Sequence, residues 1–290
     1  MPISIERVLV ATDFSRAGQR AVEVAAEWAK LARAQLRVVH VVPPRGWLRE
    51  AWGLKSSAAD VIAHHATNAL RQTADKVDPE RSLELSTGVL SGTAAQSIRL
   101  AASGYRADLL VTGARGERDE AGTRVLGGTS SKLLAAVAMP LLLVRRTRED
   151  PVSSVVAAVD LSARSRAVLE WADFAAAERP LTAYHVYDVP FTARLEAYGL
   201  PPSAVDAYRD QARAQREAEL AALVAPVARA GATTQVVEHG EAAVLLGRYI
   251  ESIRPSLVVI GKHVRRPRSP SGGSVCRFVA SSVSADVLVV

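Results

Sequence analysis

The sequence predicts an α/β fold made of two tandem, doubly wound units, each built on a five-stranded parallel sheet. Three observations lead to this prediction. The chain of 290 residues is about two average domains long. Its second half repeats landmarks of its first half, and short continuous apolar runs alternate with segments of helical periodicity. Such runs are typical of parallel strands that helices cover on both faces of the sheet.

The internal repeat is clearest at the start of each half. Asp13, in the segment 8–15, returns 147 residues later as Asp160, in the segment 156–162. Later landmarks return in the same order at nearly the same distance: 40–42 with 185–187, and 109–113 with 257–261. A fixed order of landmarks indicates duplication of one structural unit.

Each unit is expected to read strand, helix, strand, long helix, strand, helix, strand, helix, strand. In the first helix Val22, Ala25, Ala26 and Ala29 recur at the spacing of one buried helical face. The long helices are expected within 45–78 and 191–230. The expected strands after the first are 35–42, 83–89, 108–113 and 140–145, then 181–187, 234–238, 256–261 and 286–290.

A polar stretch separates the two units. Residues 145–154 are rich in arginine and serine and contain Pro151, so the boundary is expected near residue 150. The predicted domains are therefore 1–147 and 152–290.

Composition favours an ordinary globular protein and excludes several classes. Apolar residues make up 49% of the chain and charged residues 23%. Cys276 is the one cysteine, so no internal disulfide or cysteine cluster can form, and we expect it to be a small buried residue. No segment matches a membrane span or a secretory signal, which predicts a cytoplasmic protein. The net charge of +6 favours anionic partners.

Candidate binding residues follow the first and fourth predicted strands. In a doubly wound sheet, ligands bind beyond the carboxyl ends of the strands, where the strand order reverses. Asp13 and Gly113 should face that crevice, where a carboxylate accepts hydrogen bonds from ribose hydroxyls and a glycine permits close approach. Alternatively, Asp13 caps the next helix and Gly113 only turns the chain.

A second constellation predicts a phosphate site. The sequence Gly113-Ala114-Arg115-Gly116 is followed, after ten residues, by 127–131 at the start of a predicted helix. The helix amides and the hydroxyls of Thr129 and Ser130 could donate to phosphate, and Arg115, Arg118 and Arg124 add positive charge. The alternative is a solvated loop that carries arginines.

These motifs, in this order and across both repeats, resemble the universal stress protein family in its tandem form. The resemblance implies a Rossmann-like fold of the adenine nucleotide alpha hydrolase type, and ATP, with or without magnesium, as ligand. Adenine would lie near Val41, ribose at Asp13 and Gly113, and phosphates on Gly116 and the 127–130 turn. The implied binding residues are Ala11, Thr12, Asp13, Val41, Thr112, Gly113, Arg115, Gly116, Gly127, Gly128, Thr129 and Ser130. It further implies that the two last strands pair as an intramolecular pseudo-dimer, with a homodimer of chains also open.

The sequence departs from the family pattern in both copies. Gly128 stands where the family usually has Ser or Thr, which removes one phosphate hydrogen bond worth about 1.5 to 3 kcal/mol. In the second copy Val264 replaces the second glycine, the following loop is shorter, and Ser256 replaces the acidic Asp108. We therefore expect the second site to be degenerate.

Two functions remain open on the sequence. The chain has no P-loop, nucleophile elbow or zinc-protease motif, so enzymatic activity beyond slow ATP hydrolysis is not expected, and His40 and His185 are expected to be structural. The favoured function is an ATP-binding regulatory protein whose loop state modulates a protein partner. The alternative is a nucleotide-independent basic interaction module that uses the loop 262–268. That loop carries no aromatic residue, which argues against sequence-specific binding of nucleic acid.

Overall fold

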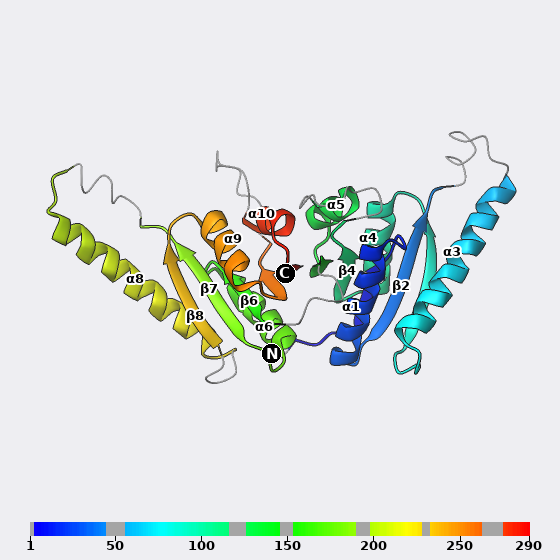
Figure 1. Ribbon diagram of the computed structural model, residues 1–290, viewed down its shortest axis with the longest axis horizontal. Helices are drawn as coiled ribbons and strands as arrows, with labels where there is room; N and C mark the ends of the chain where they lie inside the picture. The colour runs from blue at the N-terminus through cyan, green and yellow to red at the C-terminus, as the bar shows by residue number, and fades with distance from the viewer. Residues whose placement is uncertain are drawn as a thin grey trace. The chain divides into compact units, whose positions relative to one another are not determined.

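The computed structural model describes residues 3–44, 56–115, 126–145, 153–189, 198–227, 233–262 and 275–290. Apart from a few terminal residues, the chain divides into two compact units, Ser4–Asp150 and Pro151–Leu288 (Figure 1). Among the described helices, none has the length and apolarity required to cross a membrane.

The first unit is a parallel sheet with the strand order β3-β2-β1-β4-β5. The order reverses between β1 and β4, which are neighbours in the sheet although β2 and β3 separate them in the chain. Its elements are β1 (Arg7–Ala11), α1 (Arg16–Ala32), β2 (Gln35–Val42), α3 (Ser56–Val77), β3 (Leu85–Ser91), α4 (Ala94–Tyr105), β4 (Leu109–Gly113), α5 (Gly128–Ala136) and β5 (Leu141–Val144).

The second unit repeats this topology, with the strand order β10-β9-β6-β7-β8 and the reversal between β6 and β9. The doubly wound α/β fold predicted from the sequence is thus confirmed in both units. The elements are β6 (Val155–Val159), α6 (Ser165–Ala176), β7 (Leu181–Tyr187), α8 (Pro202–Val224), β8 (Thr233–His239), α9 (Ala242–Ile253), β9 (Leu257–Ile260), α10 (Val275–Ser282) and β10 (Asp286–Val289).

The central strands of each unit are buried because helices cover both faces of the sheet. In the first unit α1 packs on β1 and β4, α4 packs on β2 and β1, and helix contacts join α1 to α3 and α4 to α5. Right-handed crossovers on either side of the reversal place these two helix pairs on opposite faces. The predicted helical face is confirmed, since Val22, Ala25 and Ala29 are buried.

The long helices α3 and α8 lie inside the predicted segments 45–78 and 191–230, but β3 begins two residues later than expected. The cause is a turn after α3, where the buried Asp78 carboxylate accepts hydrogen bonds from the backbone N–H of Ser82 and of Leu83. Side-chain chemistry, rather than apolar periodicity, therefore sets the start of this strand.

Asp108 holds two strands of the sheet together and does not lie in the crevice at the carboxyl ends of the strands. It lies before β4, at the amino end of the strand, where its Oδ2 accepts hydrogen bonds from the backbone N–H of Glu6 and of Arg7, both at 2.9 Å. Ser256 occupies the matching place and accepts from the backbone N–H of Ser153 at 3.2 Å. Replacement of Asp108 by Ser256 in the second copy therefore has no direct bearing on its ligand site.

Candidate functional site

A cavity of about 480 Å³ lies at the carboxyl ends of β1, β2 and β4, beside the strand-order reversal of the first unit. Eleven of the twelve residues expected from the sequence line it: Ala11, Thr12, Asp13, Val41, Thr112, Gly113, Arg115, Gly127, Gly128, Thr129 and Ser130. Gly116 lies outside the described residues, as do Arg118 and Arg124. The structure thus brings together segments that are more than 100 residues apart in the chain.

Five further residues line this cavity and were not expected: Gly18, His40, Ala94, Ile98 and Lys132. Ala94 and Ile98 come from the first turns of α4, which packs on β2 and β1. Their contribution depends on packing between α4 and the sheet, which no motif in the sequence marks. Gly18 could have been found by comparing the repeats, because Ser165 stands 147 residues later.

Asp13 sits exposed at the cavity, two residues beyond the end of β1. Its Oδ1 accepts hydrogen bonds from the backbone N–H and the hydroxyl of Ser15, at 3.1 and 2.5 Å. Ser15, not Asp13, caps α1, since Ser15 Oγ accepts from the backbone N–H of Gly18 at 3.1 Å. The alternative in which Asp13 serves as the helix cap is therefore wrong.

Gly18 makes room for the carboxylate of Asp13. A Cβ at this position would lie 2.5 Å from Asp13 Oδ1 and 2.8 Å from Thr12 Oγ1, closer than nonbonded atoms approach. Thr12 Oγ1 in turn accepts a hydrogen bond from the backbone N–H of Phe14 at 3.0 Å. The orientation of Asp13 thus depends on a glycine in the first turn of α1.

The end of β4 is joined to α5 by a buried hydrogen bond. Ser130 Oγ donates to the carbonyl oxygen of Gly113 at 2.7 Å. The Ser130 proton, which the sequence suggested as a donor to phosphate, is therefore engaged within the protein in this structure. A Cβ at Gly113 would lie 3.1 Å from the carbonyl carbon of Ala17, so this glycine allows α1 to approach β4 closely.

His40 and His185 occupy matching places and hold the ends of β1 and β6. His40 Nδ1 lies 2.8 Å from the carbonyl oxygen of Thr12, and His185 Nδ1 lies 2.9 Å from that of Val159. The His40 ring also stacks on Phe14, with centroids 4.4 Å apart. Burial lowers the pKa of His185. These contacts agree with the expected structural role of both histidines.

The α5 side of the cavity is electropositive. Gly127, the N-cap of α5, makes no side-chain capping bond, and the first turn of α5 contains no acidic residue. Backbone N–H groups at such a helix start suit an anion. Arg115, which follows β4, and Lys132, on α5, add two positive charges to the same wall. Among the described lining residues, Asp13 carries the negative charge.

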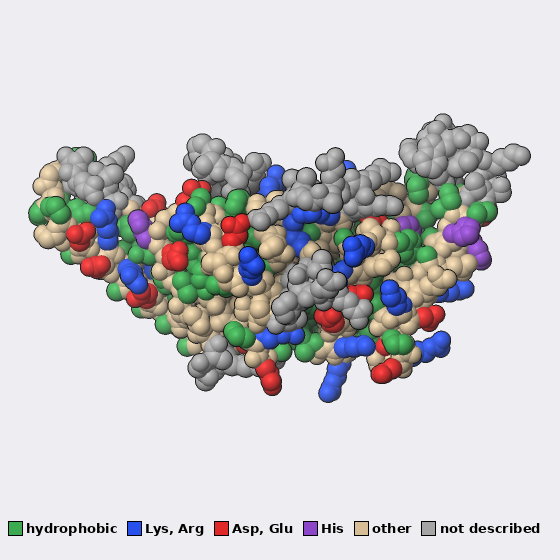
Figure 2. Space-filling model, viewed as in Figure 1, with side chains coloured by type: hydrophobic (Ala, Val, Ile, Leu, Met, Phe, Trp, Pro, Cys, Tyr) green, Lys and Arg blue, Asp and Glu red, His purple; other side chains and the backbone are tan. Residues whose placement is uncertain are grey.

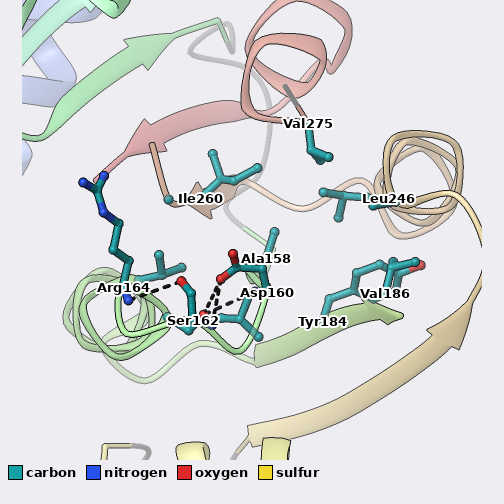
Figure 3. Close-up of a pocket in the computed structure, with 14 residues that line it drawn as sticks. Ala158, Asp160, Ser162, Arg164, Tyr184, Val186, Leu246, Ile260 and Val275 are labelled. Carbon is teal, nitrogen blue, oxygen red and sulfur yellow. Dashed lines mark hydrogen bonds between the residues drawn. The ribbon is translucent and has the colours of Figure 1, made fainter. Parts of the chain in front are cut away.

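The corresponding pocket of the second unit is contracted to about 80 Å³ (Figure 3). Asp160 lines it, but Ser165 fills the place of Gly18 and donates its hydroxyl to Asp160 Oδ1 at 2.8 Å. Ser165 Oγ also accepts from the backbone N–H of Asp160 at 3.2 Å. Figure 3 shows side chains of Tyr184, Leu246 and other apolar residues around the remaining space.

Polar groups on the α5 wall are replaced by apolar groups on α10. The carbonyl oxygen of Val144 accepts a hydrogen bond from the backbone N–H of Ala114, and that of Val290 accepts one from the backbone N–H of Lys262. Val144 and Val290 therefore occupy matching places at the ends of the two last strands, 146 residues apart. With an offset of 146 residues, Thr129 then corresponds to Val275, Ser130 to Cys276 and Lys132 to Phe278. Cys276 is buried, as expected, and burial raises the pKa of its thiol to about 11. Val264 and Gly273 lie outside the described residues.

No group of three or more His, Cys, Asp or Glu side chains in the described segments could hold a metal ion. A cavity at the strand-order reversal, with a carboxylate on one wall and cations on another, is the arrangement of a small-molecule binding site. The chain is thus a tandem protein of the doubly wound α/β class, with one open and one contracted cavity.

Comparison with known proteins identifies the family. The profile of the universal stress protein family matches residues 4–145 and 152–290, so the chain belongs to this family. A universal stress protein of Thermus aquaticus is 34% identical over 145 residues, which cover 48% of this chain and 97% of that protein.

Solved structures share the tandem fold along nearly the whole chain. A universal stress protein from Archaeoglobus fulgidus aligns with a TM-score of 0.68 and 18% identity, over 98% of this chain and 97% of that one. A functionally unknown protein from Pseudomonas aeruginosa PAO1 aligns with a TM-score of 0.66 and 19% identity, over 99% and 92%. At these identities the likeness concerns the fold.

Proposed function

We propose that the first unit binds ATP and that the occupied site regulates a protein partner. The observation that carries the proposal is the cavity of about 480 Å³ at the strand-order reversal, within the range of small-molecule sites. The proposed boundaries of the binding and degenerate domains are those expected from the sequence, 1–147 and 152–290.

The walls of the cavity suit the three parts of a nucleotide. Val41 and Ile98 offer apolar surface for a base, and Asp13 offers carboxylate oxygen for ribose hydroxyls. Arg115, Thr129 and the start of α5 offer donors and positive charge for phosphates. Since Ser130 donates to Gly113, phosphate binding would rely on backbone N–H groups, Thr129 and the cations rather than on Ser130.

Regulation would follow from the position of the site. The segment 113–130 connects β4 to α5, and both of its ends line the cavity. A nucleotide that contacts both ends would favour those states of the segment that bind it best, by an amount equal to its difference in affinity. A partner that recognises one of these states would then respond to ATP.

The alternative function, a basic interaction module, has less support. Residues 263–268 of its proposed loop lie outside the described residues. Over the described part of the face in Figure 2, lysine and arginine side chains lie among acidic ones rather than in one continuous stripe. The alternative also gives no role to the cavity of the first unit.

The test is the nucleotide content of the protein. Freshly purified chain is denatured and the released nucleotide is quantified by mass spectrometry, followed by calorimetric titration of nucleotide-free protein with ATP. We expect about one mole of ATP or ADP per chain, because only one of the two described pockets has room for a nucleotide.

The matched variants are Asp13→Ala and Asp160→Ala. Loss of a charged hydrogen-bond partner from the first cavity should weaken ATP binding about tenfold or more, whereas Asp160→Ala should leave affinity unchanged. Two moles of nucleotide per chain would contradict the expectation that the contracted second pocket has no room for a nucleotide. Absence of ATP binding in the titration, or equal effects of both substitutions, would reject the proposed site.

A further inference from the structure

We propose that Lys132 is a specificity-determining residue of the first cavity, which selects nucleotides by the number of their phosphates. The inference deepens the proposed nucleotide site and rests on it. It concerns which ligand of that class the cavity prefers, and it assigns this preference to the side chain of Lys132.

The first step is the position of Lys132. It lies on α5, three residues after Thr129, and both residues line the cavity. Residues three apart on a helix are surface neighbours, so Lys132 lies about one turn farther along α5 than Thr129. If one phosphate binds at the first turn of α5, Lys132 is therefore placed to bind the phosphates that follow it in the chain of the nucleotide.

The second step is the availability of its charge. The Lys132 side chain is exposed, and within the described part of the chain no hydrogen bond or ion pair holds its ammonium group. By contrast, Arg20, Arg166 and Arg213 are each paired with a glutamate on their own helix. A long, unpaired lysine at the wall of a cavity is suited to bind phosphate as a mobile point charge.

The third step is the direction of the ligand. Asp13 and Val41 mark the β1 and β2 side of the cavity, and Lys132 marks the α5 side beyond β4. A nucleoside held at Asp13 would extend its phosphate chain toward the α5 side, where Lys132 lies. Because Ser130 is engaged with Gly113, the side-chain donors left among the described residues at the α5 end of the cavity are Arg115, Thr129 and Lys132. Of these three, Lys132 lies farthest along α5, where it would meet the distal phosphates.

The second unit supplies an internal comparison. Phe278 occupies the position of Lys132 and Val275 that of Thr129, and the neighbouring pocket has contracted to about 80 Å³. Phe278 contacts α9, since a Cβ at Gly247 would lie 3.0 Å from its ring. The lysine is thus present in the unit with the larger cavity, and an apolar side chain replaces it in the unit with the contracted pocket.

The experiment is calorimetric titration of the full chain with adenosine, AMP, ADP and ATP at fixed ionic strength. The variants are Lys132→Ala, Lys132→Arg and, as a matched control, Lys76→Ala, which removes an exposed lysine of α3 that does not line the cavity. We expect Lys132→Ala to weaken ATP binding about tenfold or more, and AMP and adenosine binding by less than about twofold. Lys132→Arg should retain most of the ATP affinity.

Each other outcome has a definite meaning. An equal loss for ATP and AMP would overturn the inference, because Lys132 would then support the site without distinguishing its ligands. Equal losses in Lys132→Ala and Lys76→Ala would also overturn it, because net charge rather than contact would act. If the wild-type chain binds ATP and Lys132→Ala binds it equally well, only this inference fails; if the wild type binds no adenine compound, the proposed function fails with it.

Discussion

Gly128 is a position where the chain has room for a side chain beside the proposed phosphate site. A Cβ there would meet no atom of the described residues within 4 Å, and Gly128 is exposed at the first position of α5. Gly128→Ser should therefore fold normally and add a hydroxyl donor at the phosphate end of the cavity. We expect ATP affinity to rise by about tenfold, the effect of one hydrogen bond to a charged group, in calorimetric titration.

A substitution at Gly18 should lower ATP affinity in the same titration, where Gly128→Ser should raise it. A side chain there would collide with the Asp13 carboxylate, so Gly18→Val should displace Asp13 and weaken ATP binding. Equal affinities in the wild type and Gly128→Ser would show that phosphate does not reach the start of α5. An unaffected Gly18→Val would show that the orientation of Asp13 is unimportant.

The turn between α3 and β3 depends on the ionised carboxylate of Asp78. Burial alone would raise the pKa of this group, but hydrogen bonds from Leu83 and Ser82, together with Lys30, outweigh burial and lower its pKa below the ordinary value. The ionised group therefore stabilises the fold above the pKa of the unfolded chain, about 3.9. That contribution is lost as the pH falls through the lower folded-state pKa.

Asp78→Ala should lower the free energy of unfolding by about 1 to 3 kcal/mol at pH 7, because the N–H groups of Ser82 and Leu83 lose their acceptor. The difference from the wild type should shrink at pH 3 and below in urea unfolding. Asp75→Ala, at an exposed position of the same helix, is the control and should have little effect. A difference independent of pH would contradict the role of the charged form.

The strands and helices were largely predictable because each has a simple pattern. Buried parallel strands appear as continuous apolar runs, and β2 and β7 fall within the ranges expected from the sequence. The start of β3 was misplaced because the Asp78 turn, rather than periodicity, determines it. Element boundaries that depend on one side chain leave little trace in apolar spacing.

The candidate site was predictable where its residues follow strands, as Asp13 and Gly113 do, because parallel strands bring their carboxyl ends to one edge. The role of Ser130 was not predictable, because its hydrogen bond to the carbonyl oxygen of Gly113 arises only from packing of α5 against β4. Lys132 carries no motif, and its place at the cavity depends on the direction of α5. The assignment of Gly116 to the site stays a prediction.

The two units share one topology but differ about sixfold in the volume of the pocket at the strand-order reversal, about 480 against 80 Å³. Duplication preserved the strands, while Ser165 in place of Gly18 and Val275 in place of Thr129 line the smaller pocket. Binding should then be a property of one unit. A ligand that binds only the folded first unit stabilises it by about 2.7 kcal/mol at 100 times Kd.

Hydrogen exchange with mass spectrometry checks this asymmetry in the intact chain. With saturating ATP, peptides covering 11–18 and 127–132 should exchange more slowly, because local opening of the first cavity would require release of the nucleotide. Peptides covering 158–165 and 275–280 should be unchanged. At an ATP concentration near the wild-type Kd, Asp13→Ala should strongly reduce the protection in the first unit, because it weakens binding about tenfold or more. Protection of 158–165 and 275–280 in the wild type, retained in Asp13→Ala, would place a nucleotide in the second unit, because Asp13 lines only the first cavity.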